Sequence, residues 1–194
     1  MTTTTLIGVV GAGTMGRGIA QIAATAGHPV LLLDQDEAAL SHAKEGLNRI
    51  FARLIEKGRM DTRTAEAILS RITTSTRIED LSAAGLVLEA IVEKAEVKAA
   101  LFQSLEKIVA PDAVLATNTS SLSVTGLAAS LQHPERFIGL HFFNPAPLLP
   151  LVEVVPALQS DKALADEMCT TMRNWGKQPA LAKDTPGFIV NRVA

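Results

Sequence analysis

The stretch LIGVVGAGTMG, residues 6–16, decides the fold of this 194-residue chain. Its apolar start predicts a β-strand at Leu6–Val10, and the glycines that follow predict a tight loop that opens a helix. That helix should run to Ala26, with Gly27 just past its end. A strand, a glycine-rich loop and a helix in this order are typical of the first unit of a parallel sheet that binds a dinucleotide.

Each glycine of this loop has its own predicted role. Gly11 allows the tight turn, Gly13 lets the backbone approach a pyrophosphate, and Gly16 lets the helix pack close to the strand. Met15 lies between the last two glycines, and we expect it at the cofactor as well. The free amides and the positive end of the helix dipole attract phosphates. The alternative is that the glycines merely make a turn.

The second predicted strand, Val30–Asp34, supplies an acid at the expected spacing. Asp34 lies 34 − 16 = 18 residues after Gly16, close to the roughly 20 typical of an acid that accepts hydrogen bonds from the adenine ribose. Its charge would repel the 2′-phosphate of NADP, and neither Gln35 nor Asp36 offers a cation. NAD is therefore the predicted cofactor, unless Asp34 only caps the next helix.

Short apolar runs alternate with helical patterns along the rest of the chain, which predicts an α/β fold: a Rossmann-type, doubly wound, mostly parallel sheet. Further strands are expected at Leu86–Glu89, Val114–Thr117, Phe137–Phe142 and Leu151–Val155, with a weaker one at Ile72–Thr74. The charged stretch Glu37–Ser70, divided at Gly58 before a capping Asp61, predicts a helical hairpin that projects from the sheet. Glu93–Ala110 predicts another helix, stopped by Pro111.

The C-terminal residues predict a domain boundary. Thr185-Pro186-Gly187 opens an apolar helical pattern that the sequence follows for only about two turns. A helix that short needs tertiary support. We therefore expect an NAD-binding Rossmann domain at residues 1–185, and at 186–194 the start of a truncated C-terminal helical domain of a longer protein.

Composition excludes several classes of partner. The chain has 18 basic and 20 acidic residues, so it lacks the positive charge that nucleic acid or an anionic membrane would attract. No apolar run is long enough for a signal peptide or a membrane span. Cys169 is the one cysteine and can form neither an intramolecular disulfide nor a multi-cysteine metal site. We expect a cytoplasmic protein that binds no metal.

Among the four histidines, His141 stands out. His28, His42 and His133 lie in turns or charged segments and are predicted to be solvated, whereas His141 ends an apolar strand at the edge of the sheet where ligands bind. Glu153 follows 12 residues later inside another apolar run, and a buried carboxylate needs a partner. The pair would suit a general base held by an acid, but these residues alone favour a core histidine capped by backbone and a glutamate on a solvent-facing edge.

Taken together, these segments resemble the L-3-hydroxyacyl-CoA dehydrogenase family. The resemblance rests on the glycine loop with Asp34, LEAIVE at 88–93, NTSSL at 118–122, HFFNP at 141–145 with LVEV at 151–154, and GFIVNR at 187–192. The five motifs stand in the family's order and spacing and cover nearly the whole chain. The hydroxyls at 117–121, which alone could hold a substrate oxygen or cap a helix, become site candidates through it.

The resemblance implies a role for each residue of the substrate end. His141 would be the general base and Glu153 its orienting partner. Ser120 would hydrogen-bond the 3-oxygen of the substrate, and Asn191 would complete this end of the site.

The resemblance also implies how the cofactor and coenzyme A bind. Asp34 would hold the adenine ribose. Glu93, Lys98 and Asn144, together with Ser120, would lie near the nicotinamide half of NAD. The hairpin would carry part of the coenzyme A contact, with Lys57 as a cation for a phosphate or simply as a solvated side chain.

The activity implied is the reversible, NAD-dependent oxidation of an (S)-3-hydroxyacyl-CoA thioester to the 3-oxoacyl-CoA. In this family a helical second domain closes over the acyl chain and forms a homodimer, so we expect the 194-residue chain to bind NAD but to have little activity alone. The Ala146-Pro147 loop and the ending Asn191-Arg192-Val193-Ala194 are similar to the branch of the family found in aromatic-acid degradation.

Two rival functions share parts of this pattern. The 3-hydroxyacid dehydrogenases related to 6-phosphogluconate dehydrogenase share the glycine loop at 11–16, but they use a catalytic lysine and fit the His141 and Glu153 segments badly. The resemblance to hydroxyacyl-CoA dehydrogenases also extends to a lens crystallin, which has kept the fold but serves a structural role. The joint presence of Ser120, His141, Glu153 and Asn191 favours catalysis.

Overall fold

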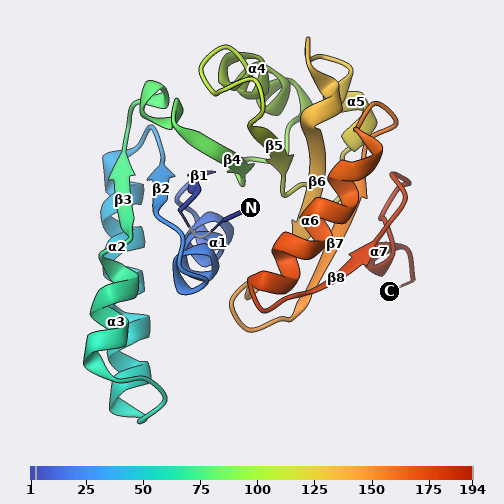
Figure 1. Ribbon diagram of the computed structural model, residues 1–194. Helices are drawn as coiled ribbons and strands as arrows, with labels where there is room; N and C mark the ends of the chain where they lie inside the picture. Colours follow the sequence, from blue (N-terminus) through green and yellow to red (C-terminus); the bar gives the residue numbers. More distant parts are fainter. Residues whose placement is uncertain (3, 194) are drawn as a thin grey trace.

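The computed structural model of the protein describes residues 1–2 and 4–193 and shows one eight-stranded sheet (Figure 1). In spatial order the strands are β3, β2, β1, β4, β5, β6, β7 and β8. Their bounds are β1 Leu6–Val10, β2 Val30–Leu33, β3 Ile72–Ser75, β4 Ala84–Glu89, β5 Val114–Thr117, β6 Phe137–Phe142, β7 Leu151–Pro156 and β8 Gln178–Leu181. Neighbouring strands are parallel except β6 and β7. The predicted fold class is confirmed.

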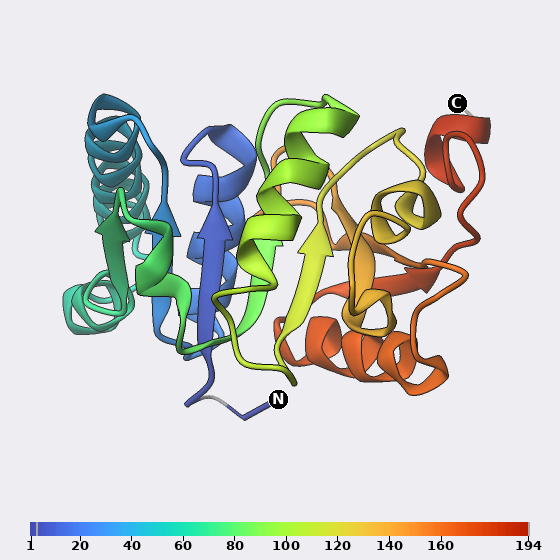
Figure 2. The same ribbon diagram turned by 90° about the horizontal axis from the view of Figure 1, so that it is seen from above.

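Helices cover both faces of the sheet, because most strands are apolar on both sides (Figure 2). The helices are α1 Thr14–Thr25, α2 Glu37–Glu56, α3 Thr62–Leu69, α4 Ala95–Leu105, α5 Val124–Ala128, α6 Lys162–Asn174 and α7 Val190–Val193. One core joins the sheet to α1, α2, α3 and α6, and the other joins it to α4 and α5. Among residues 1–2 and 4–193, none of the helices has both the length and the apolarity that crossing a membrane requires.

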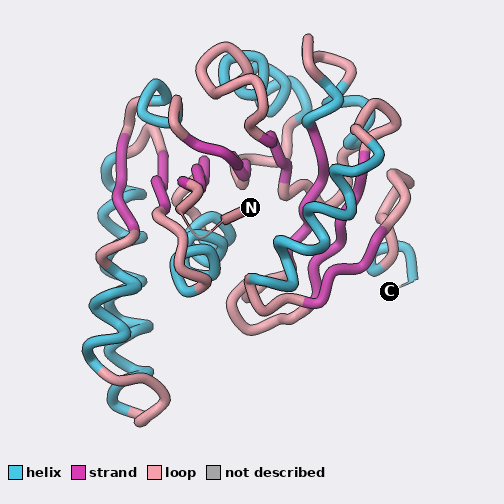
Figure 3. Tube along the Cα trace, viewed as in Figure 1, coloured by secondary structure: helices cyan, strands magenta, loops and turns pink. Residues whose placement is uncertain are grey.

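The helical hairpin projects from the sheet as predicted (Figures 1 and 3). Gly58, with φ of 63°, lies just past the end of α2. Asp61 then caps α3 by accepting a hydrogen bond from the Thr64 amide at 2.8 Å. These hydrogen bonds hold the pKa of the Asp61 carboxyl below its usual value, with the Thr64 hydroxyl contributing most.

The strand order places a ligand crevice at one edge of the sheet. The chain runs from β1 outward to β2 and β3, and then returns to the other side of β1 as β4. Ligands of open α/β sheets bind at such a switch point, outside the carboxyl ends of the strands. The residues that follow β1, β2, β4, β5 and β6 therefore line the candidate site.

Some predictions about single elements were wrong. β8 was missed because QPAL at 178–181 contains no β-branched residue and carries a proline on an edge strand. The helix expected at 93–110 spans only Ala95–Leu105, with Lys94 as its N-cap. The last helix begins at Val190 rather than directly after Gly187, because residues up to 189 form a turn.

His28 is buried rather than solvated. Its ring lies edge-on to Trp175, with the ring centroids 5.6 Å apart, and its Nδ1 is 3.1 Å from the Thr5 carbonyl oxygen. The neighbouring turn had suggested a surface position, but the aromatic contact comes from a segment 147 residues away (175 − 28). His42 and His133 are exposed as predicted.

Candidate active site

The loop between β1 and α1 needs glycine at two places and keeps open space at a third. Gly11 has φ of 104°, and a Cβ there would lie 2.6 Å from the Ala90 carbonyl oxygen. A Cβ on Gly16 would lie 1.7 Å from the Gly11 carbonyl oxygen. A Cβ on Gly13 would meet nothing within 4 Å, so no packing within the chain requires glycine at that position. The space at Gly13 is where a pyrophosphate would approach the backbone.

The N-terminus of α1, like that of α4, has no side-chain cap. In contrast, α2, α3, α5 and α6 have side-chain acceptors at their N-caps, namely Asp36, Asp61, Ser123 and Asp161. The first amides of α1 thus keep their hydrogen-bonding capacity for an anion. Together with the open space beside the loop, this uncapped terminus fits the phosphates of a dinucleotide.

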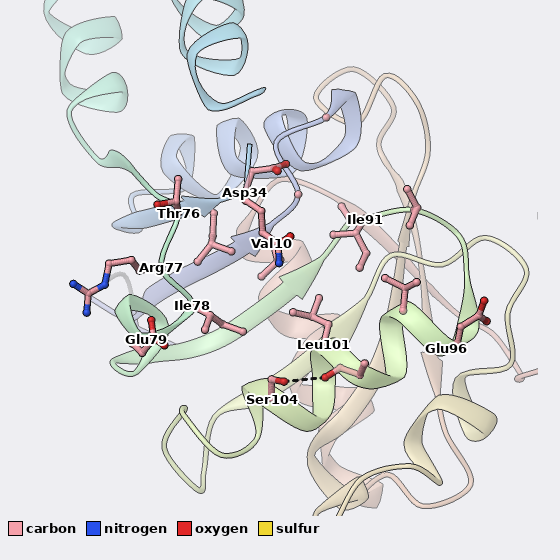
Figure 4. A pocket seen from close by; sticks show the side chains of 18 residues that line it. Val10, Asp34, Thr76, Arg77, Ile78, Glu79, Ile91, Glu96, Leu101 and Ser104 are labelled. Carbon is pink, nitrogen blue, oxygen red and sulfur yellow. Dashed lines mark hydrogen bonds between the residues drawn. The ribbon is translucent and has the colours of Figure 1, made fainter. Parts of the chain in front are cut away.

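A pocket of about 1090 Å³ extends from the loop across the ends of β1, β2 and β4 to α4 (Figure 4). Asp34 lies in its wall, where one carboxylate oxygen accepts from the Ala12 amide at 2.7 Å and the other from the Asp36 amide at 3.0 Å. Asp36, not Asp34, caps α2. The pocket also has apolar walls, such as Ile78 and Leu101, so it fits an adenosine with its ribose beside a carboxylate.

His141 and Glu153 meet across the antiparallel pair β6 and β7. They occupy the same register position, and His141 Nδ1 lies 2.7 Å from Glu153 Oε2. The Glu153 side chain is fully buried and that of His141 is 7% exposed. Because Nδ1 faces the carboxylate, the other ring nitrogen, Nε2, is left without a hydrogen bond within the described residues and can exchange a proton with a ligand.

The second oxygen of Glu153 holds the turn before α7. Oε1 accepts from the backbone amides of Ile189 and Val190, both at 2.9 Å. Phe188, which precedes them with φ of 47°, is buried, and its ring centroid lies 5.8 Å from that of His141. One buried carboxylate therefore fixes both the imidazole and the segment that carries Asn191.

Ser120 lies within reach of the same cluster. The Asn191 side-chain amide donates to the Ser120 carbonyl oxygen at 3.1 Å. The neighbouring Asn118 accepts from the Phe142 amide at 2.8 Å, which ties the end of β5 to the end of β6. The four residues predicted for the substrate end thus come from four separate segments and are joined at one edge of the sheet.

Glu93 and Lys98 form an ionic cluster with a third residue, Glu89. Lys98 Nζ lies 2.5 Å from Glu89 Oε1 and 3.0 Å from Glu93 Oε2. Glu93 accepts from the Thr119 hydroxyl and, at 2.9 Å, from the Ser120 amide. Burial opposes ionisation of Glu93, but these hydrogen bonds and Lys98 hold the pKa of its carboxyl below its usual value.

Three of the predicted site residues lie outside these contacts. Met15 packs half-buried against the core, and Asn144 is exposed on the loop after β6. Lys57 is exposed at the C-terminal end of α2, where the hairpin turns. No group of three histidine, cysteine, aspartate or glutamate side chains within residues 1–2 and 4–193 is arranged to hold a metal.

Sequence reasoning did not single out three buried or half-buried polar residues that support the site. Glu89 was quoted only as part of the family motif at residues 88–93 and was given no role. Asp184 accepts from Ser123 Oγ at 2.9 Å, the Val124 amide at 3.0 Å and the Thr125 amide at 2.7 Å. Lys177 Nζ donates to two carbonyl oxygens of the 146–149 loop, and burial lowers the pKa of its ammonium group. No local spacing pattern marks these residues, since their partners are distant in sequence.

The fold and the site define an NAD-binding domain of a dehydrogenase. Residues 6–185 match the family described as "3-hydroxyacyl-CoA dehydrogenase, NAD binding domain". The chain therefore belongs to the 3-hydroxyacyl-CoA dehydrogenase family, as its NAD-binding domain, and the predicted resemblance and cofactor are confirmed.

Individual relatives agree with this assignment. The chain is 47% identical over 188 residues to the 3-hydroxyadipyl-CoA dehydrogenase of Escherichia coli, covering 97% of this chain and 40% of that protein. It is 43% identical over 191 residues to the mitochondrial hydroxyacyl-coenzyme A dehydrogenase of Sus scrofa, covering 95% and 61%. A crystal structure of an Escherichia coli 3-hydroxybutyryl-CoA dehydrogenase superposes with a TM-score of 0.97 at 46% identity, over 98% of this chain and 40% of that one. The chain thus spans 40% to 61% of these relatives.

Proposed function

We propose that this chain is the NAD-binding part of an enzyme that reversibly oxidises (S)-3-hydroxyacyl-CoA thioesters to 3-oxoacyl-CoA thioesters. The observation that carries the proposal is the buried contact between His141 and Glu153, with Ser120 and Asn191 joined to it at the same sheet edge as the glycine loop. A Rossmann domain alone would fit many dehydrogenases, whereas this pair provides a base for removing the proton of a secondary alcohol.

The glycine loop and Asp34 would hold NAD at the crevice, where it would supply the acceptor for the hydride that leaves C3 of the substrate in oxidation. His141 Nε2 takes the hydroxyl proton. Glu153 accepts the hydrogen bond from Nδ1, so it keeps the ring in the tautomer whose free Nε2 can receive that proton, and it stabilises the imidazolium that results. In reduction the imidazolium returns the proton to the 3-oxygen.

Ser120 and the aromatic residues around His141 set the position of the substrate. The Ser120 hydroxyl donates a hydrogen bond to the 3-oxygen, and the hydrogen bond from Asn191 to the Ser120 carbonyl fixes the backbone that carries this hydroxyl. Phe143 and Phe188 flank the imidazole, at 4.4 Å and 5.8 Å between centroids, and keep water from the reacting atoms.

The thioester partner follows from the family. Lys57 at the hairpin turn supplies a cation for a phosphate of coenzyme A, and the whole protein forms a homodimer through a helical domain that follows residue 185. Relatives named 3-hydroxyadipyl-CoA and 3-hydroxybutyryl-CoA dehydrogenase make these two acyl chains the first substrates to compare.

The test is an assay of the whole protein with acetoacetyl-CoA and NADH, and with a panel of 3-hydroxyacyl-CoA thioesters and NAD. We expect turnover, and a loss of about 100- to 10,000-fold in kcat for His141→Gln, the range by which a positioned general base accelerates a reaction.

Two results would contradict the proposal. A wild-type protein that binds NADH but reduces no 3-oxoacyl-CoA would point to a structural, crystallin-like role. Full activity of His141→Gln would mean that another residue is the base, as a lysine is in the related hydroxyacid dehydrogenases. Substitution of the exposed His133, whose ring lies 3.2 Å from the Glu135 carboxylate, is the matched control and should leave kcat unchanged.

A further inference from the structure

The ionic cluster at the end of β4 contains one residue that the proposed reaction does not use. Glu89 is fully buried, and its partner Lys98 is 1% exposed. Charged side chains are costly to bury unless each has a partner. Lys98 satisfies Glu89 on one side and Glu93 on the other, so the three residues form one unit.

The contacts of Glu89 and Glu93 suit two ionised carboxylates that share one ammonium group. Glu89 accepts from the Ile91 amide and from the Thr117 hydroxyl, both at 2.7 Å, in addition to Lys98. The Ile91 amide and the Lys98 ammonium can only donate, so Glu89 Oε1 is an acceptor, and the ammonium that lies between the two glutamates favours the ionised form of both. Two negative groups and one ammonium leave the cluster with one surplus negative charge.

The cluster ends on the loop that carries Ser120. Glu93 accepts from the Ser120 amide at 2.9 Å, and the Ser120 carbonyl oxygen accepts from Asn191 at 3.1 Å. The network therefore runs without a break from the centre of the sheet to the segment that Glu153 holds beside His141. This is the end of the site assigned above to the nicotinamide.

We infer that Glu89 is a positioning residue that, through Lys98 and Glu93, fixes the Ser120 loop and supplies the surplus charge that makes the site favour oxidised over reduced nicotinamide. The inference rests on the proposed function, because it requires the nicotinamide to lie beside Ser120. The nicotinamide ring is positively charged in NAD⁺ and neutral in NADH, so a fixed negative charge lowers the free energy of the NAD⁺ complex selectively.

The ratio of the two dissociation constants, Kd for NAD⁺ over Kd for NADH, tests this inference. NADH binding is followed by its fluorescence and NAD⁺ binding by displacement of NADH. Glu89→Gln removes one charge with little change of shape, and we expect it to raise the ratio about three- to tenfold, as for a unit charge several ångströms away in a partly screened site. Thr117→Val removes the hydroxyl that donates to Glu89 and accepts from the Thr119 amide, but it removes no charge and should leave the ratio unchanged.

A double variant separates charge from structural damage. Glu89→Gln with Lys98→Met carries the same net charge as the unaltered cluster, so the ratio should return to its wild-type value although two buried contacts are lost. If Glu89→Gln alone does not fold, Glu93→Gln removes one charge from a side chain that is 36% exposed and should raise the ratio likewise.

The outcomes distinguish failure of this inference from failure of the proposed function on which it rests. An unchanged ratio in Glu89→Gln, or in Glu93→Gln where that variant replaces it, overturns the inference and leaves the proposed function standing. An equal rise in Thr117→Val overturns the charge explanation. A wild-type chain that binds neither dinucleotide overturns the cofactor site and the inference together.

Discussion

The two ends of the site are built in different ways. The phosphate-binding part of the dinucleotide end is formed by one continuous stretch, β1, its loop and the start of α1, and it works through backbone: positive φ, absent Cβ atoms and free amides. The substrate end is assembled from β5, β6, β7 and α7 and works through side chains with buried charges. We therefore expect substitutions that change shape to impair the backbone site. Substitutions that change a charge or a histidine tautomer should impair the side-chain site.

The largest effect is expected at the substrate end, for Glu153→Gln. The glutamine has the size of Glu153 but has one donor and one acceptor group. Its oxygen must still accept from the amides of Ile189 and Val190, so its NH₂ group faces His141 Nδ1 and forces the ring into the wrong tautomer. We expect kcat to fall by about 10,000-fold in the whole protein, as for the analogous change in a serine-protease triad, with NAD affinity of the chain within twofold of wild type.

A parallel loss of NAD affinity in this variant would break the comparison, because it would mean that the two ends are not independent. His141→Asn is its partner variant. It removes the base and leaves residue 153 a carboxylate, and kcat should fall to a similarly low level.

The second effect is expected at the dinucleotide end, for Gly16→Ala. The new Cβ would lie 1.7 Å from the Gly11 carbonyl oxygen, which is backbone and cannot turn aside. The helix must move away from the strand, and overpacking of this kind costs about 1–3 kcal/mol. Urea unfolding should show that loss, and titration with NADH should show weaker binding.

Gly13→Ala separates the cofactor from the fold. A Cβ at Gly13 meets nothing within 4 Å, and its φ of −67° suits alanine. The unfolding midpoint should therefore stay at the wild-type value, whereas NADH affinity should fall about tenfold, a cost of about 1.4 kcal/mol, because the Cβ occupies the approach of the pyrophosphate. Unchanged affinity would show that the dinucleotide does not cross the loop at this residue.

The same contrast explains what the sequence could predict. The glycine loop, Asp34 and the hairpin with its Asp61 cap depend on neighbours within a few residues or on a fixed spacing, so pattern alone placed them. The pairing of His141 with Glu153 needs an antiparallel turnaround in a parallel sheet, and residue patterns left that pairing open. Family resemblance identified it without giving a physical reason.

Residues whose partners are far away in the sequence were not predictable. His28 is buried by Trp175, and Glu89 is satisfied by Lys98 and by Thr117 of the next strand. Histidine and glutamate are both common on protein surfaces, so the sequence gives no reason to expect them buried. Only the assembled sheet shows the partners that allow their burial. β8 is a weak edge strand whose position depends on β7 rather than on its own composition.

The smallest effect is expected for Asp184→Ala. This variant tests the contact between the start of α5 and the segment that leads to α7. Asp184 accepts from the amides of Val124 and Thr125 at the start of α5 and fixes the segment that leads to α7. Burial opposes its ionisation, but hydrogen bonds from Thr125, Val124 and Ser123 hold the pKa of the carboxyl below its ordinary value of 3.8. Losing a helix-capping acceptor costs about 1 kcal/mol, so urea unfolding at pH 7 should show roughly that difference.

The pH dependence of this difference decides whether charge is the cause. A carboxyl whose pKa is lower in the folded than in the unfolded state stabilises the fold fully above the unfolded value and loses that contribution as pH falls through the folded one. The gap between wild type and Asp184→Ala should therefore be constant from pH 7 to about 5 and shrink below about 4. Asp166→Ala, at an exposed position on α6, is the matched control and should change stability little at either pH. A gap that persists undiminished in acid would mean that Asp184 acts through packing, and the substrate end would then depend on shape as much as the dinucleotide end does.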